Sequence, residues 1–155
     1  MKKMKYKHIV RFIPMVIWMA VIFYLSAQPA EQSSELSTGI MHILLKFMEN
    51  IVVIDEEFFH HIVRKGAHLS AYFILGILTM FAFEHRINRN TVQMAVAFLL
   101  GVLYAASDEV HQLFVPGRSG ELRDVGIDTM GVLCGIIIYV LLQKMFRKTS
   151  SERTV

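Results

Sequence analysis

The residues best suited to chemistry lie in one polar stretch, 107–128, between two long apolar runs. Its ionisable residues are Asp108, Glu109, His111, Arg118, Glu121, Arg123, Asp124 and Asp128. Such side chains are costly near a bilayer, and those that are kept there usually form ion pairs or functional sites. A histidine beside carboxylates can transfer protons, and arginine binds phosphate or carboxylate groups. The stretch therefore predicts a site for proton transfer or for anion binding.

The candidate binding residues share helix faces across several segments. Arg64, His68 and Tyr72 recur at intervals of four residues, and side chains at this interval are neighbours on a helix surface. Folding their helix against the polar stretch would form one cluster that binds an anion, because a guanidinium fork matches phosphate and carboxylate groups. The candidate ligand-binding residues are Arg64, Lys65, His68, Tyr72, Glu109, Gln112, Arg118 and Arg123.

The candidate catalytic residues are His111, Asp108, Asp124 and Asp128. His111 would act as acid or base, Asp108 would orient it, and either later aspartate would support a metal or a water. The alternative is structural, because aspartates at the start of a helix also interact with its dipole. No dense histidine or paired-cysteine pattern accompanies these residues, so they are a weak metal signal. The sequence therefore predicts no metal and no cofactor.

Four apolar runs supply the helices that must position these groups. Hydrophobic residues make up 54% of the 155, and a helix of about 20 apolar residues crosses a bilayer. The predicted spans cover about 9–27, 66–84, 91–110 and 125–143. We therefore predict an all-α polytopic membrane protein with one domain, 1–155, and a four-helix transmembrane bundle. An amphipathic helix over 33–51 would lie at the outer surface between the first two spans.

The first apolar run also has features of a secretory signal. A basic head, an apolar middle and the small residues Ala27 and Ala30 are typical of such signals. The run is longer than most signal cores, and Pro29 is poorly placed for cleavage. We therefore favour a retained first span, and the placement of the later segments is the same in both cases.

The basic residues are distributed unevenly among the predicted connections. Eleven of the 16 Lys and Arg residues lie in 1–11, 84–91 and 144–155. Cytoplasmic connections of membrane proteins are the basic ones, so both termini are expected in the cytoplasm. The polar stretch 107–128 then faces outward. This topology explains the basic ends, and no nucleic-acid partner is predicted.

Three motifs resemble the VanZ-like family of bacterial membrane proteins. They are FYLSAQP at 23–29, RKGAHLSAYFILGIL at 64–78 and SDEVHQLFVPGRSGELRDVGIDTMGVLCG at 107–135. The family is similar to the accessory protein of glycopeptide-resistance clusters that raises tolerance to teicoplanin. The resemblance therefore implies a small helical membrane bundle that acts at the cell envelope, in the bacterial cell membrane. It implies no particular reaction.

Three functional hypotheses remain open at this point. An outward polar vestibule could bind an anionic envelope lipid, a lipid-linked cell-wall precursor or a glycopeptide such as teicoplanin, with membrane lipids around the spans. A membrane-embedded enzyme could use His111 and the aspartates for acid–base chemistry on a lipid-linked or peptidoglycan substrate. The chain could instead be a structural partner of another envelope protein. The first hypothesis explains why several cations accompany apolar spans on one predicted face.

Overall fold

The computed structural model describes residues 9–48, 56–84, 87 and 90–152. Within these residues every regular element is an α-helix. The helices are α2 (Phe12–Ser26), α3 (Ala30–Met48), α4 (Glu56–Phe83), α5 (Asn90–Gln112) and α6 (Leu122–Glu152). The predicted all-α class is therefore confirmed for the described part of the chain.

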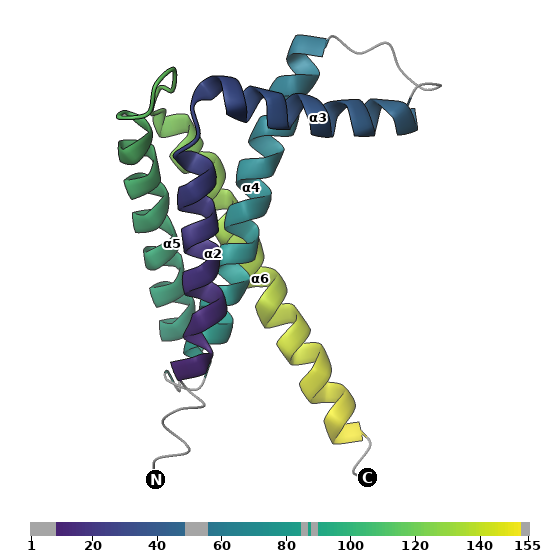
Figure 1. Ribbon diagram of the computed structural model, residues 1–155. Helices are drawn as coiled ribbons and strands as arrows, with labels where there is room; N and C mark the ends of the chain where they lie inside the picture. The colour runs from purple at the N-terminus through teal and green to yellow at the C-terminus, as the bar shows by residue number, and fades with distance from the viewer. Residues whose placement is uncertain (1–8, 49–55, 85–86, 88–89, 153–155) are drawn as a thin grey trace.

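Helices α2, α4 and α5 run alongside one another, α6 crosses them obliquely, and α3 lies across one end of this group (Figure 1). The chain turns by 109° between α2 and α3. The loop between α5 and α6 lies at the same end as α3, whereas α2 begins and α6 ends at the opposite end. We call the end at which α3 and the α5–α6 loop lie the α3 end. It brings together segments that are distant in the sequence.

Among the described residues, three helices are long and apolar enough to cross a membrane: His61–Phe83, Asn90–Gln112 and Leu122–Phe146. These correspond to the second, third and fourth predicted spans. The first prediction, 9–27, corresponds to α2, whose 15 residues extend only about 22 Å at 1.5 Å per residue. The segment counts as a span if the bent pair Phe12–Ser26 and Ala30–Ile40 crosses as one unit.

The predicted outer helix over 33–51 corresponds largely to α3, which spans Ala30–Met48. Residues 49–51 of that prediction lie outside the described residues, as do several of the side chains that would define its apolar face. The helix is therefore established, and its amphipathic character remains a prediction. Its position at one end of the other helices is shown in Figure 1.

Helices α4 and α6 make the most extensive contact in the molecule. Glycines allow their backbones to approach closely. A Cβ added at Gly76 would lie 2.5 Å from the Val132 carbonyl oxygen, and one added at Gly135 would overlap the Phe73 carbonyl oxygen. Small residues at helix contacts are typical of membrane bundles, where close van der Waals packing drives association.

We expect Gly135→Ala to lower the free energy of unfolding by about 1–3 kcal/mol, because the added methyl group forces α4 and α6 apart. Gly126→Ala is the matched control on the same helix, since nothing lies within 4 Å of a Cβ at that position. Thermal unfolding in detergent measures the difference. Equal melting temperatures for the two variants would contradict this packing.

Helix α2 is fixed to the other helices along its length. Trp18 Nε1 donates a hydrogen bond to the Ala71 carbonyl oxygen at 2.8 Å, which joins α2 to α4. Tyr104 from α5 donates to the Met19 carbonyl oxygen at 2.5 Å. These bonds to backbone atoms hold α2 at a defined height and rotation, so the residues at its end are positioned against α4 and α5.

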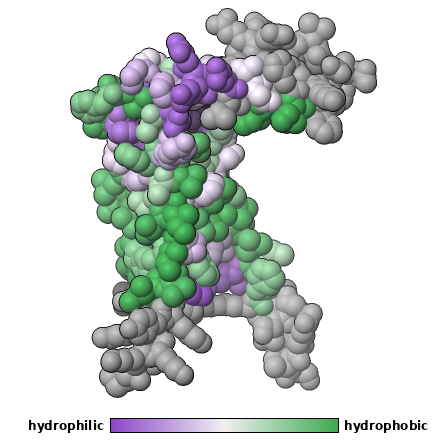
Figure 2. Space-filling view, viewed as in Figure 1, coloured by the Kyte–Doolittle hydropathy of each residue, from purple (hydrophilic) through white to green (hydrophobic). Residues whose placement is uncertain are grey.

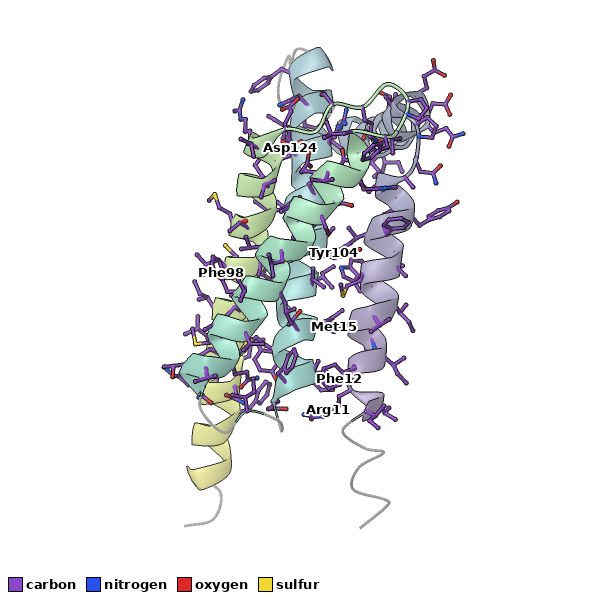
Figure 3. All side chains as sticks on the ribbon, turned by 90° about the vertical axis from the view of Figure 1, so that its left-hand side faces the viewer. Arg11, Phe12, Met15, Phe98, Tyr104 and Asp124 are labelled. Atoms are coloured by element: carbon purple, nitrogen blue, oxygen red, sulfur yellow. The ribbon has the colours of Figure 1, made fainter. Side chains whose placement is uncertain are left out.

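At the end opposite α3, Arg11 forms an ion pair with Glu84 at 2.8 Å. Gln143 Nε2 donates to the other Glu84 carboxylate oxygen at 2.9 Å. Burial alone would raise the pKa of Glu84, but the hydrogen bonds from Arg11 and Gln143 lower it below its ordinary value. An ionised Glu84 therefore joins the start of α2 to the ends of α4 and α6. Figure 3 shows Arg11 at this end and Asp124 at the α3 end.

Candidate functional site

On the face shown in Figure 2, hydrophilic residues gather at the α3 end, above a largely hydrophobic band. Beneath this surface lie side chains that are both polar and buried. They include Asp108, Glu109, Gln112, Asp124 and Asp128. Buried polar groups are normally hydrogen-bonded, so the partners of each group decide whether it has a structural or a functional role.

A cavity of about 260 Å³ opens among α2, α3, α4, α5 and the α5–α6 loop at this end. Its apolar wall includes Ile22, Leu25 and Ile40. Its charged and polar lining residues are Ser26, Ser33, Ser37, Arg64, His68, Tyr72, Asp108 and Arg118. An apolar wall with a few convergent polar groups is the usual composition of a ligand pocket. Five of the sequence-predicted site residues are therefore brought to one cavity.

Arg118 lies between the cavity and the end of α2. Its guanidinium donates hydrogen bonds to the Gln28 carbonyl oxygen at 2.9 Å, to the Leu25 carbonyl oxygen at 3.3 Å and to Gln112 Oε1 at 3.2 Å. The last carbonyls of a helix lack partners within the helix, and here an arginine from a distant loop binds the Leu25 carbonyl together with the Gln28 carbonyl just beyond the helix. Burial, together with the nearby Arg64 charge, lowers the pKa of Arg118.

The loop that carries Arg118 is held by its backbone. The Ala30 amide donates to the Pro116 carbonyl oxygen at 3.3 Å, which joins the loop to the first residue of α3. Gly117 has φ +75°, a backbone conformation that residues other than glycine rarely adopt. The Pro116-Gly117 turn thus directs the chain so that Arg118 faces the end of α2.

Arg118 is held by two backbone carbonyls and by Gln112, and no described carboxylate lies within ion-pair distance of Arg64. Its side chain lines the cavity, and its charge acts on Arg118. Two guanidinium groups that repel each other at one cavity are stabilised by an anion between them. Asp108 lines the same cavity, so the charged lining combines two guanidinium groups with a carboxylate.

Three lining residues present buried polar atoms that have no hydrogen-bond partner among the described residues: Ser26 Oγ, Tyr72 Oη and Asp108 Oδ1. A hydroxyl that is removed from water without a partner costs about 1–3 kcal/mol. Atoms that line a cavity can recover this cost from a bound polar group or from water. The cavity thus offers hydrogen-bonding groups in addition to its arginines.

A network on α5 positions the neighbouring acids. Gln112 Nε2 donates to Asp108 Oδ2 and to Glu109 Oε1, each at 3.3 Å. Glu109 Oε2 accepts a hydrogen bond at 2.8 Å from the backbone amide of Glu121. Gln112 therefore joins Arg118 on one side to two acids on the other, and Glu109 fixes the loop just before α6.

The second predicted cation on α4 has a different environment. Lys65 forms an ion pair with Asp124 in the first turn of α6 and lies 3.9 Å from Glu121. The side chains of Lys65 and Asp124 are 16% and 9% exposed, so this pair is largely shielded from water. Arg123 is exposed and has no ion-pair partner among the described residues. Neither cation lines the cavity.

The profile of the VanZ/LLP1 family matches residues 12–143. This match includes the cavity-lining residues and most of the chain. The chain belongs to the VanZ/LLP1 family. No curated protein and no solved structure has a significant match to it. The family and the apolar helices together indicate a membrane protein of the VanZ type.

In this VanZ/LLP1 protein, His111 is separated from the acids with which it was grouped. Its ring stacks on Phe23 of α2, with centroids 4.4 Å apart, and its buried Nε2 has no hydrogen-bond partner within the described ranges. Asp108 accepts from Gln112 instead, and no carboxylate forms an ion pair with His111 within the described residues. The proton-transfer arrangement of Asp108 and His111 is thus not assembled in this conformation.

His68 and Asp128, in contrast, are neighbours. His68 Nδ1 lies 3.5 Å from Asp128 Oδ1, which joins α4 to α6 beside the cavity.

Sequence reasoning gave no role to Ser26, although it lies within the FYLSAQP motif that carried the family resemblance. A serine at the end of an apolar span was the available signal. Its meaning depends on how α2 rotates against α4 and α5.

Proposed function

We propose that this VanZ/LLP1 protein binds an anionic lipid of the bacterial envelope in the cavity at the α3 end. A lipid-linked phosphate is the ligand class that fits best. The observation that carries the proposal is Arg64, a cavity-lining cation without an ion-pair partner among the described residues. A phosphate provides the negative charge and the paired acceptor oxygens that the planar guanidinium fork binds.

The composition of the cavity supports a ligand with both a charged head and an apolar chain. Arg64 and Arg118 provide the positive wall, and the hydroxyls of Ser26 and Tyr72 are without partners. Ile22 is part of an apolar wall that suits the first carbons of a hydrocarbon chain. About 260 Å³ accommodates a headgroup rather than a whole lipid, so the chain would extend into the bilayer.

We further propose that the α3 end faces outward and that both termini are cytoplasmic. The excess of Lys and Arg in 1–11, 84–91 and 144–155 supports this orientation. In this topology α2 and the first part of α3 form a broken fourth span, and the cavity lies near the outer leaflet. The ligand would then be a lipid on the outer side of the membrane, where cell-wall precursors and glycopeptides also meet.

Binding of undecaprenyl phosphate to the detergent-solubilised protein tests the proposal. Arg64→Ala is expected to weaken binding about tenfold or more, because a hydrogen bond to a charged group contributes about 1.5–3 kcal/mol. Arg123→Ala is the matched control, since it removes the same charge from an exposed position outside the cavity. Undecaprenol, which lacks the phosphate, should bind weakly to all three proteins.

Teicoplanin provides a second arm of the same experiment. If teicoplanin binds in an Arg64-dependent manner and undecaprenyl phosphate does not, the ligand is a glycopeptide rather than a lipid phosphate. Equal binding of the lipid phosphate by wild type, Arg64→Ala and Arg123→Ala would reject the cavity as its site. Arg64-dependent binding of teicoplanin would support a link to teicoplanin tolerance, whereas equal binding of the lipid phosphate by the three proteins would not.

A further inference from the structure

Three ionisable side chains from three helices converge beside the cavity. One ligand atom each from His68 on α4, Glu109 on α5 and Asp128 on α6 lie within 4.8 Å of one another. His68 also lines the cavity, so the cluster adjoins its wall. The packing of the bundle fixes the positions of these three groups relative to one another. Acids on a single surface helix are not fixed in this way.

Asp128 provides a second and independent observation. The residue is 0% exposed, and neither of its carboxylate oxygens has a hydrogen-bond partner in the part of the chain that the structure describes. The nearest basic atom is His68 Nδ1 at 3.5 Å, which is beyond the length of a good hydrogen bond. The nearby lysine of α4, Lys65, is paired with Asp124 instead. A fully buried carboxylate whose basic contact is one histidine nitrogen at 3.5 Å is costly, and a bound cation would stabilise it.

We propose that His68, Glu109 and Asp128 bind a divalent first-row metal ion, Zn²⁺ or Mn²⁺. Two carboxylates neutralise a double positive charge, and this removes the cost of burying Asp128. Metal–ligand bonds of about 2.0–2.2 Å place neighbouring ligand atoms about 3–3.6 Å apart. The distance of 3.5 Å between His68 Nδ1 and Asp128 Oδ1 lies in this range.

The chemistry of the ligands selects the metal. An imidazole nitrogen suits zinc and other transition metals, whereas Mg²⁺ and Ca²⁺ prefer sites made of oxygen atoms alone. Glu109 is oriented by hydrogen bonds from the Glu121 amide and from Gln112. Such outer partners fix the position of a metal-binding carboxylate, and each oxygen keeps a further lone pair for the metal.

Metal content and metal-dependent stability test the site. The full-length protein is purified without an affinity tag, treated with EDTA and then titrated with Zn²⁺ or Mn²⁺. We expect about one metal ion per chain by elemental analysis. Saturation with one of the two metals should raise the melting temperature by about 5 °C, because binding to the folded state stabilises it. A wild-type protein that binds neither metal and shows no shift would overturn the proposal.

Variants locate the metal within the chain. Asp128→Asn removes a ligand charge with little change in volume, and it should lose both the bound metal and the shift in melting temperature. Glu121→Gln is the matched control, because its side chain is 51% exposed at the same end of the molecule and does not belong to the cluster. Wild-type metal content in a folded Asp128→Asn protein would assign the metal elsewhere.

If Asp128→Asn does not fold, His68→Gln provides the same comparison. The measurement uses no lipid, so its outcome is independent of the anion proposal. Wild-type protein that binds the metal but not undecaprenyl phosphate would reject the anion proposal alone. Wild-type protein that binds the lipid but no metal would reject the metal site alone.

Discussion

Arg118→Ala is expected to reduce both stability and anion binding. The guanidinium donates to the Leu25 and Gln28 carbonyl oxygens and to Gln112, and its removal leaves these acceptors without that partner. We expect the free energy of unfolding to fall by about 2–4 kcal/mol, since hydrogen bonds from charged donors contribute about 1.5–3 kcal/mol each. Chemical unfolding in detergent and binding of undecaprenyl phosphate measure the two effects.

Arg64→Ala separates the two roles. It should weaken binding without a comparable loss of stability, because no described carboxylate pairs with Arg64. Arg118→Lys should be intermediate, since a single ammonium group replaces a fork with several donors. If Arg118→Ala were as stable as wild type, Arg118 would not be the group that fixes the end of α2 to the α5–α6 loop.

Lys65→Ala is the second substitution with a large expected effect. It leaves the nearly buried Asp124 without its cationic partner, close to Glu109 and Asp128. Breaking a buried pair from one side costs about 3–5 kcal/mol, and the partial exposure of Lys65 places the expected loss near the lower value. The free energy of unfolding of the detergent-solubilised protein measures this loss.

The double variant Lys65→Ala, Asp124→Asn shows the origin of that effect. Removing both charges should recover most of the stability, because the penalty comes from an uncompensated carboxylate rather than from lost packing. A double variant that is no more stable than Lys65→Ala alone would show that the lysine acts through its hydrocarbon stem. The pair would then have little importance for the start of α6.

Sequence periodicity predicts much of the helical framework, because an apolar run of the right length has few alternatives to a membrane helix. Helix α4 ends at Phe83, close to the end of the predicted span 66–84, and α5 contains the whole of the predicted span 91–110. The grouping of His68 with Asp128 also follows from sequence, since each residue lies near the predicted outer end of its own span.

The rotation of each helix is not contained in the pattern of a single segment. His111 follows Asp108 by three positions in the sequence, yet His111 contacts Phe23 while Asp108 lines the cavity. Glu109 rather than His111 lies with His68 and Asp128. Which neighbour on a helix meets the bundle depends on packing with several partners at once, and spacing within one helix does not determine this.

The end of α2 shows a second limit of the same kind. The apolar run continues to about residue 27, and Pro29 predicts a helix end, but neither feature predicts the turn of 109° into α3. The turn depends on contacts made by Arg118, a residue that is 90 positions from Gln28. A cation that looked free to bind a ligand therefore has a structural role as well, and Arg64 is the less constrained of the two.

Photo-crosslinking in membrane vesicles tests the central proposal most directly. The probe is a polyprenyl phosphate with a photoreactive group near its head, and the cross-linked peptides are identified by mass spectrometry. We expect cross-links to residues lining the cavity in α3 and α4, such as Ser37 and Ala67. The yield of these cross-links should fall strongly in Arg64→Ala and stay at the wild-type value in Arg123→Ala. Cross-links confined to the outer faces of α5 and α6, at equal yield in all three proteins, would contradict binding in the cavity.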